Sequence, residues 1–224
     1  MISPQAHLVE NIFNKEKLQQ KATRDGYGQG LVLAGKENPK VVVLCADLSD
    51  STRSAMFQKE FPERFIECGI AEQNMMGLAA GLAVSGKIPF VSTYAVFCPG
   101  RNWDQLRVNV CYNYANVKLT GAHAGVSVGH DGATHQGLED IAMVRCLPNI
   151  RVLAPCDVIE TRKATLAASR IYGPVYLRFA REKTPVFTTE ETPFEIGRAE
   201  WFYRPEGKPE VVIIACGPLV YNSL

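Results

Sequence analysis

The chain has 224 residues, of which 46% are hydrophobic and 21% charged, and its formal net charge is +1. This composition is that of a globular protein with a large core, and the balanced charge gives no basic field that would favour nucleic acid or a membrane surface as a partner. No apolar run approaches the ~20 residues that span a bilayer, and the first residues lack the pattern of a signal peptide. We therefore expect a cytoplasmic protein.

Short β-branched runs alternate with longer helical segments, a pattern typical of a parallel sheet with helices on both faces. The sequence predicts strands at 41–46, 65–68, 88–96, 117–121, 151–154 and 175–179. It predicts helices at 72–84, 102–114, 136–146 and 158–169, and a loop at 122–134 that is rich in glycine and histidine. Together these elements predict one α/β domain over residues 1–187.

The composition changes after this domain. Residues 188–208 are rich in proline, threonine and acids, which is typical of a linker. The run EVVIIAC at 210–216 then predicts a buried strand. We expect residues 209–224 to be the start of a second, truncated α/β domain.

The seven cysteines are scattered along the chain, and none forms a CxxC pair. This spacing argues against a zinc site or a disulfide framework and favours reduced thiols that pack as small apolar side chains. They are Cys45, Cys68, Cys98, Cys111, Cys146, Cys156 and Cys216.

A single acid, Glu72, begins an otherwise apolar helix that contains Met75, Met76 and Leu78. A carboxylate in such a place either points to solvent or loses hydration, which favours its protonated form. A carboxylic acid held in a pocket is suited to acid/base chemistry. The alternative role for Glu72 is a favourable interaction with the helix dipole.

Polar residues gather in four loops that follow predicted strands, at 47–52, 69–74, 123–135 and 178–182. Ligands of open parallel sheets bind at the carboxyl ends of the strands, so we expect these loops to form one site. The third loop holds His123, His130 and His135, three of only four histidines, together with Asp131. Their irregular spacing argues against a metal site, and we predict no metal ligands in this chain.

Two motifs in order give a specific resemblance. RFIECGIAEQNMMGLAAGLAVSGKIPFVSTYAVF, followed by HDGATHQGLEDIAMVRCLPNIRVLAPCD, resembles the pyrimidine-binding domain of transketolases. The similarity is greatest to the two-subunit form, in which this half is a separate carboxy-terminal chain, and it covers about residues 20 to 183. It implies thiamine diphosphate as cofactor and transfer of a two-carbon ketol unit from a ketose phosphate to an aldose phosphate.

The resemblance also implies roles for cofactor-binding residues. Glu72 would hydrogen-bond a ring nitrogen of the aminopyrimidine and activate the cofactor, while Tyr94 and Phe97 would wall that ring. By residue type alone, both aromatics could equally be core residues. A third aromatic of the family falls near Gly100 here, so one wall would be thinner or supplied otherwise. Asp47 matches an aspartate that approaches the cofactor across a dimer interface, and its alternative role is a helix cap.

Substrate-binding residues follow by the same matching. His123, Asp131 and His135 resemble positions that contact the hydroxyls and the reacting carbonyl of the sugar, and His135 and His123 join Glu72 as candidate catalytic residues. Arginine suits a two-pronged grip on phosphate, whereas the alternative is an ordinary surface charge. The positions that match the sugar-phosphate site are Arg24, Ser51, His123 and Arg181.

Half of the expected active site is missing from this sequence. Thiamine diphosphate enzymes hold the diphosphate through a divalent cation on a domain with a GDG motif, and the HDG at 130–132 is not that motif in context. The resemblance therefore implies a separate partner chain with the diphosphate-binding domain, self-association into a heterotetramer, and Mg²⁺ ligated mainly by the partner.

Three alternatives remain open at this point. The beta subunit of a 2-oxo acid dehydrogenase has a glutamate in a similar helix start. A deoxyxylulose-phosphate synthase shares GIAEQ and the THQ loop but normally keeps all its domains on one chain. A non-catalytic assembly subunit could retain the same fold.

Overall fold

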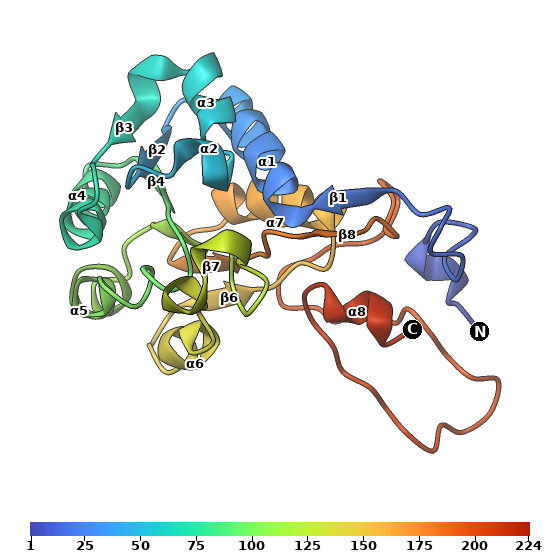
Figure 1. Ribbon diagram of the computed structural model, residues 1–224. Coiled ribbons are helices and arrows are strands. Elements are labelled where there is room, and N and C mark those ends of the chain that lie inside the picture. The colour runs from blue at the N-terminus through green and yellow to red at the C-terminus, as the bar shows by residue number, and fades with distance from the viewer.

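A six-stranded sheet forms the centre of the computed structural model, which describes residues 1–224 (Figure 1). Its order is β3-β2-β4-β5-β7-β6, and each neighbouring pair is parallel. All six predicted strands are confirmed, although the strand predicted at 88–96 is shorter because the chain turns after residue 92. The strands are β2 (Val41–Cys45), β3 (Phe65–Glu67), β4 (Ile88–Ser92), β5 (Lys118–Gly121), β6 (Arg151–Leu153) and β7 (Val175–Arg178).

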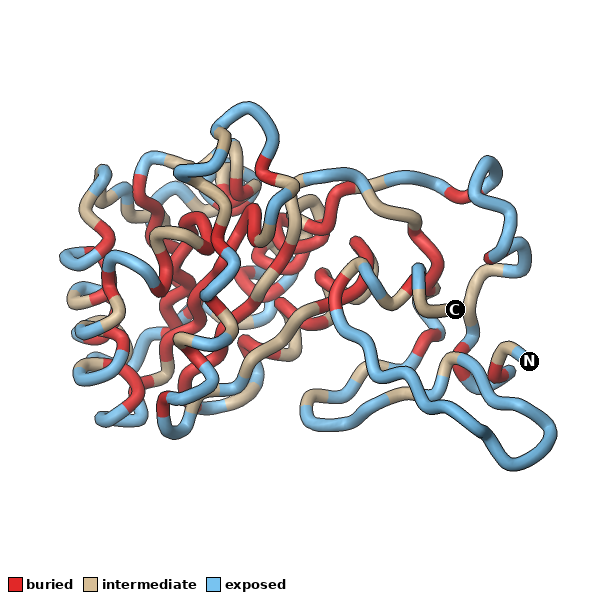
Figure 2. Tube along the Cα trace, turned by 60° about the horizontal axis from the view of Figure 1, so that its bottom comes forward, coloured by how far each residue is buried: buried red, intermediate tan, exposed pale blue.

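The sheet is buried on both faces because successive side chains of a strand point to opposite sides. On β2, Val43 belongs to the core beneath α1 and α7, and its neighbour Leu44 belongs to the core beneath α4. Figure 2 shows that the buried residues gather in the sheet and in the helices that cover it. The predicted parallel α/β architecture is therefore confirmed.

Helices α1 (Thr23–Glu37) and α7 (Val158–Arg170) lie side by side on one face (Figure 1). Their backbones approach closely, since a Cβ on Gly30 would lie 2.5 Å from Cβ of Thr165. The sequence predicts α7 but not α1. Four glycines within α1 lower its helix propensity. Gly26 and Gly30 are required by the close contact with α7, whereas Gly28 and Gly35 lie against α3 (Ala55–Glu60) and the residues that flank it.

The other face is covered by α4 (Glu72–Val84), α5 (Trp103–Gln105), the π-helix η3 (Leu106–Tyr112) and α6 (Asp140–Arg145). The predicted helix 72–84 is confirmed, and the helix predicted at 102–114 is divided between α5 and η3. The helix predicted at 136–146 begins only at Asp140. Residues before it pair with the preceding loop instead, where Gly125 N donates to Gly137 O at 2.8 Å.

Short helices fill the connections. The predicted loop 122–134 contains one single-turn helix and most of a second, which places its histidines on a defined backbone. The short elements are η1 (Pro4–Ala6), α2 (Ser49–Thr52), α3 (Ala55–Glu60), η2 (Pro62–Arg64), η4 (Gly129–Asp131), η5 (Ala133–His135) and α8 (Leu219–Asn222).

The two ends of the chain form a smaller unit beside the sheet, where both termini lie (Figures 1 and 2). Strand β1 (Gln20–Ala22) pairs antiparallel with β8 (Lys183–Pro185). A satellite core of Ile12, Leu18, Cys156, Phe187 and Tyr221 joins the amino-terminal segment to α8.

The buried strand predicted at 210–216 is wrong. These residues belong to no strand, and Val211 and Ile214 are 75% and 93% exposed. Figure 1 shows this segment as part of a long loop that leads to α8, away from the sheet. No other strand lies alongside it, so its backbone groups have no partner with which to form a sheet.

The cysteines form no disulfide, and Cys45, Cys98, Cys111 and Cys156 are buried. Burial raises the pKa of Cys98 and Cys111 to about 12, which keeps these thiols neutral. The predicted role as small apolar side chains is confirmed for the four buried residues. In contrast, Cys146 and Cys216 are exposed.

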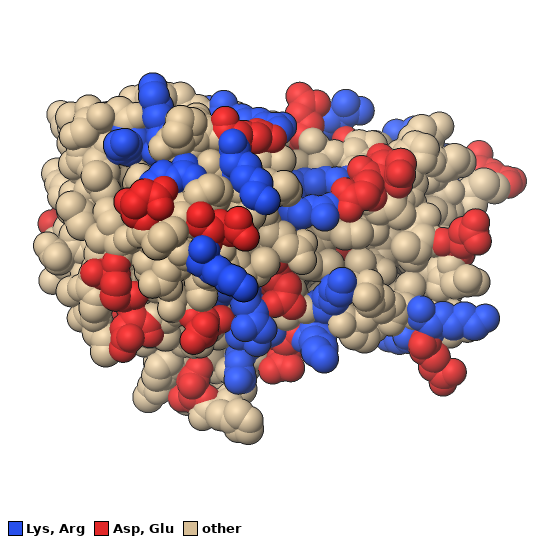
Figure 3. All heavy atoms as spheres, turned by 90° about the horizontal axis from the view of Figure 1, so that it is seen from above, with Lys and Arg blue, Asp and Glu red and all other residues tan.

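The outer surface carries both signs of charge. On the face drawn in Figure 3, lysine and arginine side chains alternate with aspartate and glutamate, in keeping with the net charge of +1. No helix is both long enough and apolar enough to cross a membrane.

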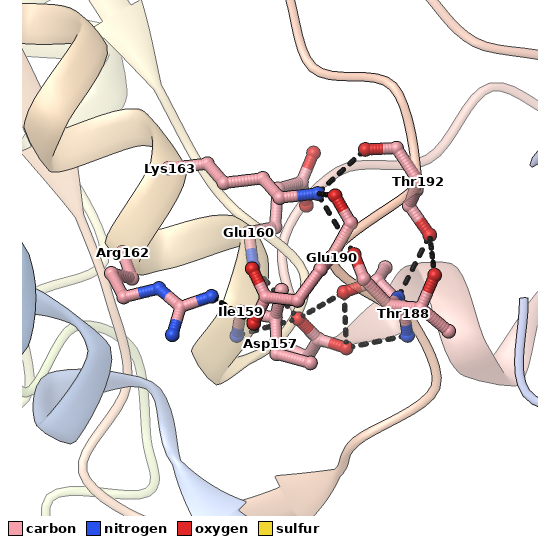
Figure 4. Close-up of polar contacts among 9 residues, drawn as sticks. Asp157, Ile159, Glu160, Arg162, Lys163, Thr188, Glu190 and Thr192 are labelled. Carbon is pink, nitrogen blue, oxygen red and sulfur yellow. Dashed lines mark hydrogen bonds and ion pairs between the residues drawn. The ribbon is translucent and has the colours of Figure 1, made fainter. Parts of the chain in front are cut away.

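Asp157 fastens α7 to the segment that leaves the sheet domain (Figure 4). This carboxylate is fully buried and caps the helix by accepting from the N–H groups of Ile159 and Glu160, both at 3.0 Å. It also accepts from the N–H groups of Phe187 and Thr188, at 3.0 and 2.8 Å, and from the Thr188 hydroxyl. Lys163 strengthens the junction by donating to three carbonyl oxygens of residues 189–192.

We expect Asp157→Ala to lower the free energy of unfolding by at least about 3 kcal/mol, because several buried donors would lose their acceptor together. Urea denaturation followed by circular dichroism measures this value. Asp104→Ala, which removes an exposed ion pair with Arg107, is the control and should leave stability nearly unchanged. Equal midpoints for the two variants would contradict the role given to Asp157.

Candidate active site

The four polar loops predicted from the sequence follow β2, β3, β5 and β7, and the turn after β4 joins them. Because these strands are parallel, their carboxyl ends lie at one edge of the sheet. Tyr94 bridges to Ala122, and Ala124 N donates to Phe179 O at 3.2 Å. The predicted convergence at this edge is confirmed.

Glu72 is the first residue of α4 and is only 3% exposed. The loop before it leaves Ile70 72% exposed, so the carboxylate lies just beneath the surface. Both of its oxygens accept from Nη1 of Arg101, at 3.1 and 3.2 Å. Asn102 is buried beside it and donates to the Glu72 carbonyl at 3.4 Å. The sequence left open whether Glu72 points to solvent, and the structure shows it buried; its arginine partner was not predicted.

An aromatic cluster is joined to Glu72 through Arg101, whose guanidinium contacts both the carboxylate and the Phe97 ring. Tyr94 and Phe97 lie nearly parallel, with ring centroids 6.0 Å apart. His123 packs against Tyr94 at 4.1 Å, and His135 meets Phe97 edge-on at 5.3 Å. Two predicted cofactor residues and two predicted catalytic residues therefore form one aromatic cluster.

His123 is held as a neutral ring. It is 1% exposed, and burial lowers the pKa of His123 from 6.5 to about 4, with the charge of Arg24 adding to the decrease. Arg24 Nη1 lies 3.4 Å from His123 Nε2. Since a guanidinium can only donate, Nε2 accepts and the ring proton lies on Nδ1. This Nδ1 is buried without a partner, which leaves a hydrogen-bond donor available to a ligand.

Positive charge gathers around His123. Arg24 Nη1 donates to the Ser51 carbonyl at 3.0 Å, and its Nε is buried without a partner. Burial lowers the pKa of Arg24, and the charges of Arg53 and Arg181 lower it further. The nearby Asp25 pairs with Arg53 at 2.7 Å rather than with Arg24. Arg24 thus has no carboxylate partner in an ion pair, which suits an anionic ligand such as a phosphate.

The remaining predicted residues border this cluster. Arg181 Nη1 donates to the Val128 carbonyl at 2.8 Å and so holds the histidine loop. Asp131 is exposed on η4, close enough for its charge to raise the pKa of His123. His135 is half-buried, with Nδ1 2.9 Å from the Thr134 hydroxyl. Ser51 contacts Arg24 through its carbonyl oxygen, and no hydrogen bond is formed by its hydroxyl.

Asp47 follows β2 in a left-handed conformation with φ of 57° and is exposed. Its N–H donates to Glu67 Oε1 at 2.8 Å, and the same oxygen accepts from Gly69 N at 2.9 Å. The carboxylate of Asp47 caps no helix, since the short helix that follows has no side-chain cap. The alternative of a helix cap is therefore wrong, and the side chain is free to meet another molecule.

Three arginines of this edge were not predicted from the sequence. Arg101 pairs with Glu72, Arg53 pairs with Asp25, and Arg178 donates to the buried Asp140 at 2.9 Å. Each pair joins residues at least 28 positions apart, so no local spacing announces it. Of the three, only Arg178 could have been suggested by the sequence, because it lies within the predicted polar loop at 178–182.

The comparisons with known proteins decide the family. The model described as transketolase, pyrimidine binding domain, matches residues 19–186. The chain belongs to the transketolase family. It is 47% identical over 206 residues to the putative transketolase C-terminal section of Methanocaldococcus jannaschii, covering 91% of this chain and 64% of that protein. It is 43% identical over 204 residues to transketolase-like protein 2 of Mus musculus, covering 91% and 32%.

A solved structure described as split gene transketolase, inactive beta4 tetramer, is 50% identical. It matches with a TM-score of 0.71 over 79% of this chain and 56% of that chain. The sequence-based recognition of the transketolase pyrimidine domain is therefore confirmed. The chain spans less than two thirds of the length of these transketolase relatives.

The site suits the aminopyrimidine half of thiamine diphosphate, the cofactor that the transketolase family implies. Glu72 and Phe97 already hold one flat, nitrogen-bearing group, the Arg101 guanidinium, which donates to the carboxylate and lies 4.0 Å from the ring centroid. The same acceptor and ring face fit a flat heterocycle with N–H donors. No group of three or more His, Cys, Asp or Glu side chains is arranged to hold a metal ion.

The neutral state of His123 predicts a pH dependence of stability. Because its folded pKa lies near 4, the unfolded chain binds the proton first, and stability falls as the pH drops from about 6.5 towards 4. The loss from this residue is on the order of 2 kcal/mol or more. We expect His123→Asn to flatten the dependence measured by urea denaturation between pH 4 and 7. The exposed His130→Asn control should keep the wild-type slope, and a wild-type slope in His123→Asn would contradict the assignment.

Proposed function

We propose that this chain is the pyrimidine-binding subunit of a two-chain transketolase. With thiamine diphosphate, the assembled enzyme transfers a two-carbon ketol unit from a ketose phosphate to an aldose phosphate. The observation that carries this proposal is the position of Glu72, a buried carboxylate beside Phe97 at the same sheet edge as His123 and Arg24. Membership of the transketolase family supports it.

Each residue of the edge has a task in this reaction. Thiamine diphosphate, when bound, supplies a nucleophilic carbon and an electron sink for cleavage of the bond next to the ketose carbonyl. Glu72 holds a proton at the pyrimidine nitrogen, in a site where water does not compete for the short hydrogen bond. Tyr94 and Phe97 flank the ring and exclude water.

The other side of the cluster binds the substrate. Arg24 and Arg181 hold the sugar phosphate, and the Ser51 segment borders the same site. His123 donates from Nδ1 to a substrate oxygen, since this is the N–H left without a protein partner. Asp131 binds a sugar hydroxyl, and His135 moves a proton at the reacting oxygen. Asp47, which is exposed at this edge, would approach a cofactor held at a subunit interface.

The chain supplies only half of this site, so the proposal includes a partner chain with the diphosphate-binding domain. That partner would hold Mg²⁺ between its own ligands and the cofactor's phosphates. Two exposed apolar residues of this part of the chain, Ile70 before α4 and Leu78 within it, suit an interface. The similar split-gene transketolase is described as an inactive tetramer, which supports self-association without activity. We propose a cytoplasmic heterotetramer that acts in the pentose phosphate pathway.

We propose that the chain is divided into three parts, with boundaries after residues 187 and 208. Residues 1–187 form the pyrimidine domain, 188–208 form a linker, and 209–224 begin a further transketolase domain. The exposed apolar run at 211–214 supports this division, because exposed apolar surface of this kind is typical of a segment that another element covers.

Mixing the chain with a partner that carries the GDG motif, thiamine diphosphate and Mg²⁺ tests the function. We expect two-carbon transfer between sugar phosphates in the mixture and none from either chain alone, because each holds half of the site. A coupled assay for the aldose product measures it. Activity with pyruvate instead would favour a 2-oxo acid dehydrogenase, and no cofactor binding in any pairing would favour an assembly subunit.

A further inference from the structure

Arg101 makes two contacts that the proposed function assigns to the cofactor. Its Nη1 donates to both oxygens of Glu72, at 3.1 and 3.2 Å. Its guanidinium carbon also lies 4.0 Å from the centroid of Phe97. The ion pair joins a carboxylate that is 3% exposed to an arginine side chain that is 49% exposed, so the partner nearer to solvent is the arginine.

The turn after β4 brings Arg101 to this place. Its N–H donates to the Phe97 carbonyl at 2.8 Å, which folds the turn back on itself. A Cβ on Gly100 would lie 2.1 Å from the Val96 carbonyl oxygen, so the turn requires glycine there. The third aromatic that the resemblance implies falls near Gly100, which has no side chain, and Arg101 covers the Phe97 ring.

Arg101 resembles an aminopyrimidine in the features that Glu72 and Phe97 recognise. A guanidinium is flat, donates N–H hydrogen bonds in its plane, and stacks on aromatic rings. A buried carboxylate without a partner is costly, so Glu72 needs a donor whenever no ligand is bound. The half-exposed Arg101 can meet this need and still swing into solvent.

Resting on the function proposed above, we propose that Arg101 is a placeholder for the aminopyrimidine. In the free chain it occupies the carboxylate and the ring face, and it leaves when the cofactor enters. Arg101 therefore stabilises the unassembled subunit and lowers its affinity for the cofactor. Because the cofactor must displace Arg101, this arginine helps to set the cofactor concentration that is needed to fill the site.

If Arg101 is such a placeholder, Arg101→Gln will tighten cofactor binding. In the complex with the diphosphate-domain partner and Mg²⁺, we expect the Kd for thiamine diphosphate, measured by calorimetry, to fall roughly fivefold, because no ion pair has to be broken. Arg107→Gln is the matched control, since Arg107 is also 49% exposed in an ion pair, and its Kd should equal the wild-type value. An unchanged or higher Kd in Arg101→Gln would overturn the placeholder.

A second readout needs neither cofactor nor partner. In the free chain, phenylglyoxal should modify Arg101 more slowly than Arg107, and Glu72→Gln should remove this difference, as measured by peptide mass spectrometry. Equal rates in the wild type would also overturn the proposal. If cofactor binding depends on Glu72 but is unaffected by Arg101→Gln, only the placeholder role of Arg101 is contradicted. If no variant shows binding that depends on Glu72, the proposed function fails as well.

Discussion

A buried carboxylate must have a partner, and the site described here depends on that constraint. Glu72 lies at the first turn of α4, shielded from water, and its charge is balanced by Arg101 from the turn after β4. The pair ties two neighbouring parts of the sheet edge together across 29 residues. A ligand that binds at this edge must either keep this pair or replace Arg101. A ligand that replaces Arg101 must donate to the carboxylate, so Glu72 favours ligands with N–H donors.

The parallel sheet explains how side chains from distant parts of one chain come to lie in a single site. Loops after β2, β4, β5 and β7 meet at one edge, so residues distant in sequence lie together without any special local geometry. One side of the edge presents an acid and aromatic rings, and the other presents arginines around a neutral histidine. The two sides suit a heterocycle and a phosphate, the groups that the proposed function requires.

The sequence predicted the six strands of the sheet well because short, β-branched runs such as VVVLCA at 41–46 favour a strand buried on both faces. Helix α1 was not predicted because its glycines serve close tertiary contacts with α7 and with α3, which composition does not reveal. The run at 210–216 has the pattern of a buried strand, but a strand also needs a neighbour. For the site, motifs indicated Glu72, His123 and Arg24, whereas Arg101 was missed because its pairing is created by a turn that Gly100 makes possible.

The most direct test of the account is exchange of the cofactor's thiazolium proton with solvent deuterium in the assembled complex, followed by NMR. Glu72→Gln should slow this exchange at least about a hundredfold while the chain keeps its fold, because the amide cannot hold the proton that the acid provides. The exposed Glu63→Gln variant should exchange at the wild-type rate. Unchanged exchange in Glu72→Gln would contradict the central role given to this carboxylate.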